Sequence, residues 1–446
     1  MSIVRDGRGL ELTASGAATA AAHDGIVEAF LKYRAATPQL LKAALDADPD
    51  APMLHAMRGA FTLMAYKSAL LPAAREAIAT AARLAGTERE RAHAAALDAW
   101  ADGAPERAAA IWRDIVARHP TDILAFRLHH FCAFWMGRAP EMLAVVEAAL
   151  PAWDPGLPGW GSMLACRAFA NEECGNHRIA ESAGREAVRL DPGDLWAVHA
   201  VAHVMEMEGR RGEGIAWVEA AKPRLAGASN LAHHIVWHQA MFHLERGDHA
   251  EVLRLYDTGF RNLDSPLTQA NPDLYIDVQN AASMLFRLER QGVDVGDRWE
   301  ELAEKAETRI GDCASPFTLP HWMMALCATG RLDAARRMLD AIRDAGRGNA
   351  GEHARILREA AAPACEALLR RAEGDFSGAV AALRPALGTL PELGGSHAQQ
   401  DVLEQLFLDC ALRADAAEDI RTLLERVAGR WPTPPERRAG YRAALG

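Results

Sequence analysis

Single glycines recur at a nearly constant interval along most of this chain, and each one separates two stretches with helical hydrophobic spacing. They are Gly103, Gly137, Gly175, Gly209, Gly247, Gly292, Gly330 and Gly374. Successive members of this series are 34, 38, 34, 38, 45, 38 and 44 residues apart. Because glycine adopts the left-handed turn conformation at no steric cost, this spacing predicts repeated pairs of helices joined by tight turns.

The first clear repeats show this punctuation in detail. One unit reads as a helix over Arg89–Ala101, a turn at Asp102-Gly103 and a second helix over Pro105–Arg118. The next reads as helices over Asp122–Met136 and Pro140–Leu150, with proline again in the first turn of the second helix. Proline is tolerated there because that N–H has no intrahelical acceptor.

Composition supports helices over strands throughout the chain. Half of the residues are hydrophobic and 24% are charged, which is typical of a folded protein. Alanine dominates the apolar residues, whereas Val, Ile and Thr are sparse and never alternate as strands require. We therefore expect an all-α fold in which antiparallel helix pairs stack into an α-α superhelix, either open or curled closed on itself.

Bulk charge and cysteine usage exclude several classes of protein. The formal net charge is −11, and acidic residues are interspersed with arginine, so a basic face for nucleic acid is not expected. The seven cysteines include no CxxC pair, which favours free thiols in a reducing compartment over a disulfide scaffold. No apolar run is long enough to span a membrane and no signal peptide stands out, so we expect a soluble cytoplasmic protein. The oligomeric state is left open.

Domain organisation is expected to be a single repeat domain over residues 1–446. Within it we expect N-terminal helices over 1–86, the first clear repeats over 87–150, central and C-terminal repeats over 160–430 and a terminal helix over 431–446. Residues 1–12 are expected to be a short lead-in before a helix over Thr13–Tyr33. The loop 151–159 contains three prolines and two glycines, and is either a lobe boundary or a loop that folds over a groove.

The stretch Leu195–Asp257 contains seven of the 17 histidines. They are His199, His203, His233, His234, His238, His243 and His249. Most of them lie on the first helix of each pair, so they are candidates for a shared polar surface.

Several motifs resemble those of the tetratricopeptide repeat protein 38 family, in matching order and spacing over most of the chain. They are Ala197–Arg210, His234–Ala240, Leu244–Asp248 and Gly394–Gln399. The resemblance implies an all-helical repeat fold of tetratricopeptide type and carries no settled chemistry. One departure is Pro320 before His321, where relatives have an acidic or small polar residue, so no partner carboxylate is carried over to that position.

Tetratricopeptide repeats direct certain positions of each first helix into an inner groove. At 13, 10, 6 and 3 residues before Gly209 stand Trp196, His199, His203 and Glu206. The equivalent count from Gly247 gives His234, Trp237, Met241 and Leu244, with His238 bordering this stripe. His321 lies nine residues before Gly330, and His397 joins the surface only if the array curls closed. Histidines from several helices are therefore expected to converge.

These groove residues suggest three roles. As acid–base catalysts we select His199, His203, Glu206 and His238, and the possible pairs are His203 with Glu206 and His238 with Glu245. As walls of a ligand site we select Trp196, His234, Trp237, His321 and His397. As ligands of a divalent metal we select His199, His203 and His234, because histidines four residues apart on a helix can share one ion.

The less specific alternative is that each histidine is a hydrogen-bonded polar residue of the core. Ser396 invites interpretation as a nucleophile beside His397, but a serine after Gly394-Gly395 is far more often the N-cap of a helix. Cys166 and Cys174 are most simply core thiols. No motif requires a cofactor, and a divalent metal is the one that the histidines would accommodate.

Two functions therefore compete. The first is a groove lined by His, Trp and Glu that binds a small polar molecule, with or without acid–base or metal-assisted catalysis. The second is a protein-interaction scaffold without catalysis, the usual role of tetratricopeptide arrays. Peptide-carboxylate clamps in such arrays use Lys, Arg and Asn, whereas His, Trp and Glu occupy those positions here. This contrast favours the small-molecule interpretation, although fold alone does not decide function.

Overall fold

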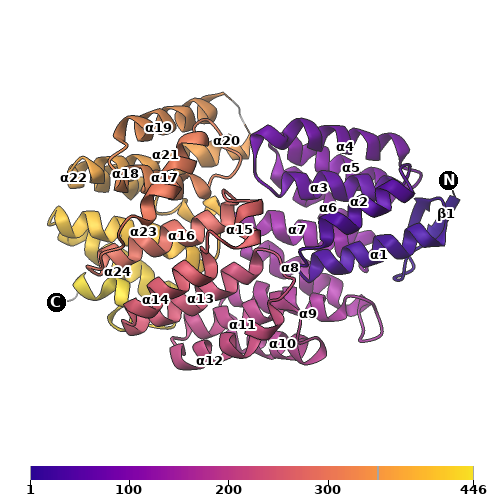
Figure 1. The fold of residues 1–446 in the computed structure, drawn as a ribbon, viewed down its shortest axis with the longest axis horizontal. Helices are drawn as coiled ribbons and strands as arrows, with labels where there is room; N and C mark the ends of the chain where they lie inside the picture. The colour runs from indigo at the N-terminus through magenta and orange to yellow at the C-terminus, as the bar shows by residue number, and fades with distance from the viewer. Residues whose placement is uncertain (1, 349–350, 445–446) are drawn as a thin grey trace. The chain divides into compact units, whose positions relative to one another are not determined.

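The computed structural model describes residues 2–348 and 351–444, and helices make up most of this part of the chain (Figure 1). Two compact units are present: residues up to Val201 with Ala221–Leu231, and Ala202–Ala220 with residues from Ala232 onward. The division falls inside the helices Leu195–Met207, Arg211–Ala221 and Leu231–Arg246, and not at the loop 151–159. That loop is tied to the first unit, where the Trp153 indole N–H donates a 2.8 Å hydrogen bond to the Pro120 carbonyl.

The first unit begins with two short strands and continues as helices. Its elements are β1 (Ser2–Arg5), β2 (Glu11–Ala14), α1 (Ala17–Leu31), α2 (Thr37–Ala47), α3 (Pro52–Leu63), α4 (Leu71–Leu84), α5 (Glu88–Ala101), α6 (Pro105–Arg118), α7 (Ile123–Trp135), α8 (Ala139–Ala149), α9 (Trp160–Glu173) and α10 (His177–Leu190). Helix α11 (Leu195–Met207) starts in this unit and ends in the second.

The two strands correct the expected lead-in, and α1 begins at Ala17 instead of Thr13. They pair antiparallel, with Ser2 opposite Ala14. The turn between them is held by the Asp6 carboxylate, which accepts the backbone N–H groups of Arg8 (2.9 Å) and Leu10 (2.8 Å). Local bonding of this kind by aspartate favours a turn over a helix, and hydrophobic spacing alone does not reveal it.

The second unit is also built from helices. They are α12 (Arg211–Ala221, of which residues to Ala220 belong here), α13 (Leu231–Arg246, of which residues from Ala232 belong here), α14 (His249–Leu255), α15 (Pro266–Ala270), α16 (Tyr275–Arg290), α17 (Arg298–Thr308), α18 (Thr318–Ala328), α19 (Leu332–Arg347), α20 (Glu352–Ile356), α21 (Ala362–Ala372), α22 (Phe376–Leu383), α23 (His397–Arg413) and α24 (Ala417–Arg430). Helices α14 and α20 each continue into one π-helical turn, Tyr256–Phe260 and Leu357–Ala361.

The turn glycines confirm the repeat pattern. All eight have positive φ, between 68° and 82°, which is the conformation in which glycine has no steric penalty. The predicted helix Pro105–Arg118 is observed with those bounds, and its partner begins one residue earlier, at Glu88. The fold is therefore all-α, made of tetratricopeptide-like helix pairs. Between α23 and α24 the turn residue is Asp415, with φ 51°, so a search for glycines misses this last pair.

Small residues let α10 and α11 pack closely within the first unit. Helix α10 buries Ala180, Ala183, Gly184 and Ala187, which recur at helical spacing along one face. A Cβ atom on Gly184 would lie 2.6 Å from Cγ2 of Val201 on α11, which is too close for any side chain. This packing fixes the position of α11, the helix that carries the first histidine pair.

The C-terminal segment does not form the terminal helix expected over 431–446. Residues Pro435–Arg437 and Ala439–Ala444 are short 3₁₀ helices, and residues 445–446 lie outside the described part of the chain. Three prolines between 432 and 435 lack the N–H that a continuous helix needs. The segment instead packs in the second unit, where the Thr433 hydroxyl donates to the Met207 carbonyl at 2.8 Å across 226 residues of sequence.

Among the described residues, no helix combines the length and the apolar character needed to cross a bilayer.

Candidate functional site

Helix α11 carries the first pair of candidate histidines. Asp194 caps the start of the helix, accepting the Ala197 backbone N–H at 3.0 Å. His199 and His203 follow four residues apart, so their side chains lie one turn apart on the same face. Both are buried, with 2% and 0% of their surface exposed.

Helix α13 carries the second pair, His234 and His238, at the same spacing and also buried. The His234 ring stacks on the Trp237 indole with centroids 5.2 Å apart and planes 11° apart. The Nδ1 atom of His234 lies 2.9 Å from Oδ1 of Asn280 on α16. Stacking on one face and a hydrogen bond at the edge together fix the orientation of this ring.

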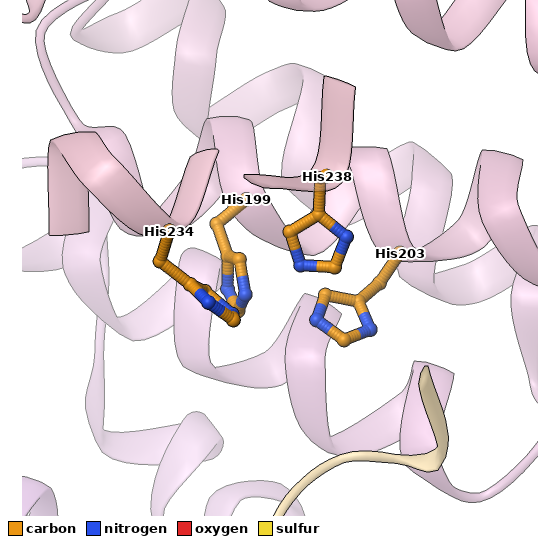
Figure 2. Close-up of side chains that lie close together, drawn as sticks. All are labelled: His199, His203, His234 and His238. Atoms are coloured by element: carbon orange, nitrogen blue, oxygen red, sulfur yellow. The ribbon is translucent and has the colours of Figure 1, made fainter. Parts of the chain in front are cut away.

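The four imidazoles gather at one place (Figure 2). One side-chain nitrogen from each of His199, His203, His234 and His238 lies within 4.8 Å of those of the other three. The ring centroids of His203 and His238 are 4.4 Å apart, and those of His234 and His238 are 4.8 Å apart. We call these four residues the histidine cluster. Counting from the turn glycines placed His238 at the border of this surface, whereas the structure includes it.

Glu206 is the carboxyl group beside the cluster. Its Oε2 lies 2.7 Å from Nδ1 of His238. Burial raises the pKa of Glu206 to about 8 and lowers the pKa of His238 to about 3. At neutral pH the pair is therefore a hydrogen bond between a protonated carboxylic acid and a neutral imidazole.

The two other cluster imidazoles of the second unit, those of His203 and His234, are neutral as well. Burial and the neighbouring imidazoles lower the pKa of His203 and of His234 well below the usual range for histidine. Neutral imidazoles do not exchange protons readily near pH 7, which disfavours acid–base catalysis. Each instead has one nitrogen lone pair, which is the form that binds metal ions.

Glu206 and Glu245 have other partners than the two possible acid–base pairs require. Glu206 hydrogen-bonds His238 on the neighbouring helix and not His203 on its own. Glu245 is directed elsewhere, accepting Arg211 Nη2 at 2.8 Å and the Ala439 backbone N–H at 3.0 Å. The helical count alone could not locate these partners, because Arg211 begins α12 and Ala439 lies in the C-terminal segment.

Two further predicted residues lie outside the cluster. His321, on α18, directs Nδ1 to the Phe317 carbonyl of its own helix at 2.8 Å, and burial lowers its pKa to about 4. His397 is the first residue of α23 and is half-buried. Its charge contributes to the lowered pKa of His203.

Trp196 lies in the first unit and packs among side chains of its core. Its ring centroid is 4.7 Å from that of Phe169 and 5.7 Å from that of Tyr33, and the Arg127 guanidinium lies over the indole at 4.4 Å. These protein side chains occupy the surface of Trp196 that was predicted to wall a ligand site. Trp237 is fully buried between His234 and Arg287, with the guanidinium 6.0 Å from its ring centroid.

A buried ionic network in the second unit was missing from the sequence interpretation. The Asp401 carboxylate on α23 accepts Arg438 Nη2 at 2.7 Å and the Tyr441 hydroxyl at 2.5 Å, and Arg287 Nη2 lies 3.9 Å away. The charges of Arg287 and Asp401 both influence the pKa of Glu206. These residues are far apart in sequence, and the one available signal was charged residues inside otherwise apolar helices.

A small cavity borders Glu206 on the side of the C-terminal segment. Its lining includes Met241, Phe242, Trp431 and Thr433. Its volume is about 20 Å³, which holds one water molecule and excludes an organic ligand.

The interpretation of Ser396 as an N-cap is confirmed, and Cys166 is a buried core thiol, whereas Cys174 is only half-buried. The Ser396 hydroxyl accepts the Gln399 N–H at 3.3 Å, in a capping box at the start of α23. All seven cysteines, which lie in the described part of the chain, are free thiols. Burial raises the pKa of Cys166 to about 11, so this thiol is not activated.

Comparison with known proteins places this geometry in context. No protein-family model matches the chain. Among solved structures, it is similar to yeast Tom70 with 13% sequence identity, covering 96% of this chain and 86% of that chain, at a TM-score of 0.38. It is also similar to the P58(IPK) TPR domain with 13% identity, covering 77% of this chain and 84% of that chain, at a TM-score of 0.19. Neither likeness assigns a function to this chain.

Proposed function

We propose that this chain is a tetratricopeptide-type scaffold that binds another protein or a peptide. The observation that carries the proposal is the close packing of the candidate site residues. The residues that would bind a small molecule pack against one another, and the cavity beside Glu206 has a volume of about 20 Å³. Pockets for organic ligands are typically about 300–1,000 Å³.

The protonation states support the same choice. His203, His234 and His238 have pKa values well below neutrality, and Glu206 has one near 8. A buried neutral set of this kind suits a structural or ligand-holding role better than proton transfer at pH 7. The small-molecule and catalytic interpretations gain no support, and the scaffold alternative is preferred.

The test is a two-arm binding experiment on the full chain. In the first arm, proteins captured on the immobilised chain are identified, then produced separately and titrated in solution, and hydrogen exchange maps the protected helices. In the second arm, a panel of amino acids, dicarboxylates, sugars and nucleotides is screened for an increase in Tm. We expect saturable 1:1 binding of a protein with protection on contiguous helix pairs. Stabilisation by a small organic compound without any saturable protein binding would reverse the assignment.

We also propose membership of the tetratricopeptide repeat protein 38 family. The motifs that support it lie on α11 and its turn, on α13, and at the start of α23. An experimental structure of a family member provides the test. Its helices with these motifs should superpose on α13 and α23 of the second unit in the same order and register, and a different order would refute membership.

A further inference from the structure

The histidine cluster joins two pairs with the same spacing. His199 and His203 are separated by one turn of α11, and His234 and His238 by one turn of α13. A helix holds such a pair with both rings on one face, where they can contact the same ion. One nitrogen atom from each of the four rings lies within 4.8 Å of the nitrogen atoms of the other three.

Neighbouring groups orient the rings of α13. Asn280 Oδ1 can only accept a hydrogen bond, so the Nδ1 atom of His234 carries the proton and Nε2 carries the lone pair. In His238 the Nδ1 atom is bonded to Glu206, which leaves Nε2 on the opposite side of the ring. An imidazole whose second nitrogen bonds a carboxyl group or an amide oxygen is the usual arrangement of a metal-binding histidine.

We propose that His203, His234 and His238, with His199 one turn earlier on α11, bind a divalent transition metal ion, with zinc as the expected occupant. Four imidazole nitrogens suit zinc, copper, nickel or cobalt and do not suit calcium or magnesium, which prefer oxygen. Zinc takes four ligands at about 2.0–2.1 Å, which places neighbouring nitrogens about 3.4 Å apart. The four nitrogens lie within 4.8 Å of one another, so metal binding requires them to approach to that spacing.

Other buried histidines of the chain show what a structural histidine looks like. His321 hydrogen-bonds a carbonyl of its own helix, and His93 lies 3.0 Å from the Asp122 carboxylate. A second group with metal-like composition, Asp6, His23 and Asp24, already holds a cation, because Arg8 contacts both carboxylates. The histidine cluster differs from these in gathering several neutral donors around one point.

The proposal goes beyond the scaffold function and does not depend on it. The experiment uses the untagged full chain, first stripped with a chelator. Zn²⁺ is titrated in competition with a chromophoric chelator, and Co²⁺ is added separately to record its d–d absorption. We expect one equivalent of bound metal, an intense tetrahedral Co²⁺ spectrum and a rise in Tm with Zn²⁺.

The variants His203→Gln and His238→Gln are expected to weaken Zn²⁺ binding at least about 100-fold, since each removes a direct ligand. His321→Gln is the matched control, because it removes a buried histidine of the same unit outside the cluster and should bind as the wild type does. Circular dichroism checks that each variant is folded. If a cluster variant does not fold, the wild-type Co²⁺ spectrum decides alone. An octahedral Co²⁺ spectrum, or equal Zn²⁺ affinity in wild type and cluster variants, would overturn the proposal.

Discussion

The start of α7 in the first unit and the histidine cluster both bury histidine beside a carboxyl group, with opposite electrostatics. At α7 the Asp122 carboxylate accepts Arg89 Nη1 at 2.7 Å and lies 3.0 Å from His93 Nε2. Burial alone would raise the pKa of Asp122, but the charges of His93 and Arg89 lower it well below the usual value. Beside the cluster, burial prevails and the pKa of Glu206 is raised to about 8.

The difference is one of charge balance. The negative charge of Asp122 is balanced by a buried cation, so this group of residues needs no further ligand and its role is structural. The histidine cluster has several neutral donors, and a cation is what would complete it. Both places combine histidine with a buried carboxyl group, and the geometry separates a structural histidine from a candidate ligand.

The largest expected effect comes from breaking the balanced region. Asp122→Ala leaves Arg89 and His93 buried without their carboxylate and removes the cap of α7. We expect the free energy of unfolding to fall by about 3–5 kcal/mol, measured by urea denaturation. The control is Asp114→Ala on α6, whose side chain is 69% exposed and should change stability by less than about 0.5 kcal/mol. A similar small loss in Asp122→Ala would mean that the buried charges are not balanced as described.

A second prediction concerns Asp194, the buried carboxyl group that caps α11. Burial, with a smaller contribution from Asp191, raises its pKa to about 6. The folded state therefore holds this proton more tightly than the unfolded state, whose pKa is near 3.8. Its contribution to stability is complete below about pH 4 and is lost as the pH rises through 6.

Asp194→Asn keeps the oxygen that caps the helix and removes the titration. We expect the variant to be more stable than the wild type at pH 7.5, by on the order of 2–3 kcal/mol. The difference should shrink towards zero near pH 4, as measured by urea denaturation across this range. A difference that is the same at both pH values would contradict the raised pKa.

The smallest expected effect sharpens the comparison at the cluster. Asn280→Ala removes the oxygen bonded to His234 Nδ1 and leaves every proposed metal ligand in the sequence unchanged. We expect Zn²⁺ affinity to fall about 10- to 100-fold. Asn280→Asp keeps an acceptor at this position and should retain the affinity, as measured by the same competition titration. If alanine and aspartate behave alike, His234 does not need this partner to bind metal.

Much of the fold could be predicted from the sequence, because turn glycines mark helix pairs through a local backbone requirement. Asp415 was missed because a non-glycine residue occupies the same left-handed conformation. The N-terminal strands were missed because side-chain bonds from Asp6 and Glu90 stabilise them, and Glu90 accepts the Thr13 N–H at 2.7 Å across 77 residues of sequence.

At the site, counting from the glycines brought His199, His203 and His234 together, as the structure does, while their role stays a prediction. The hydrogen-bond partners could not be predicted. Asn280 comes from α16, and the Asp401 network comes from α23 and the C-terminal segment. Helical periodicity describes one helix at a time, and these contacts depend on how distant helices pack.

The contact between Thr433 and Met207 has a consequence for folding. In an open repeat array each repeat contacts only the adjacent repeats, so the two ends of the array can unfold independently. Here a hydrogen bond joins residues 226 positions apart, and Arg211 and Glu245 contact the same C-terminal segment. Forming these contacts closes a long loop, which costs chain entropy. The contacts stabilise the second unit only when the helices between them are folded. The second unit should therefore lose its structure in one cooperative step and not repeat by repeat.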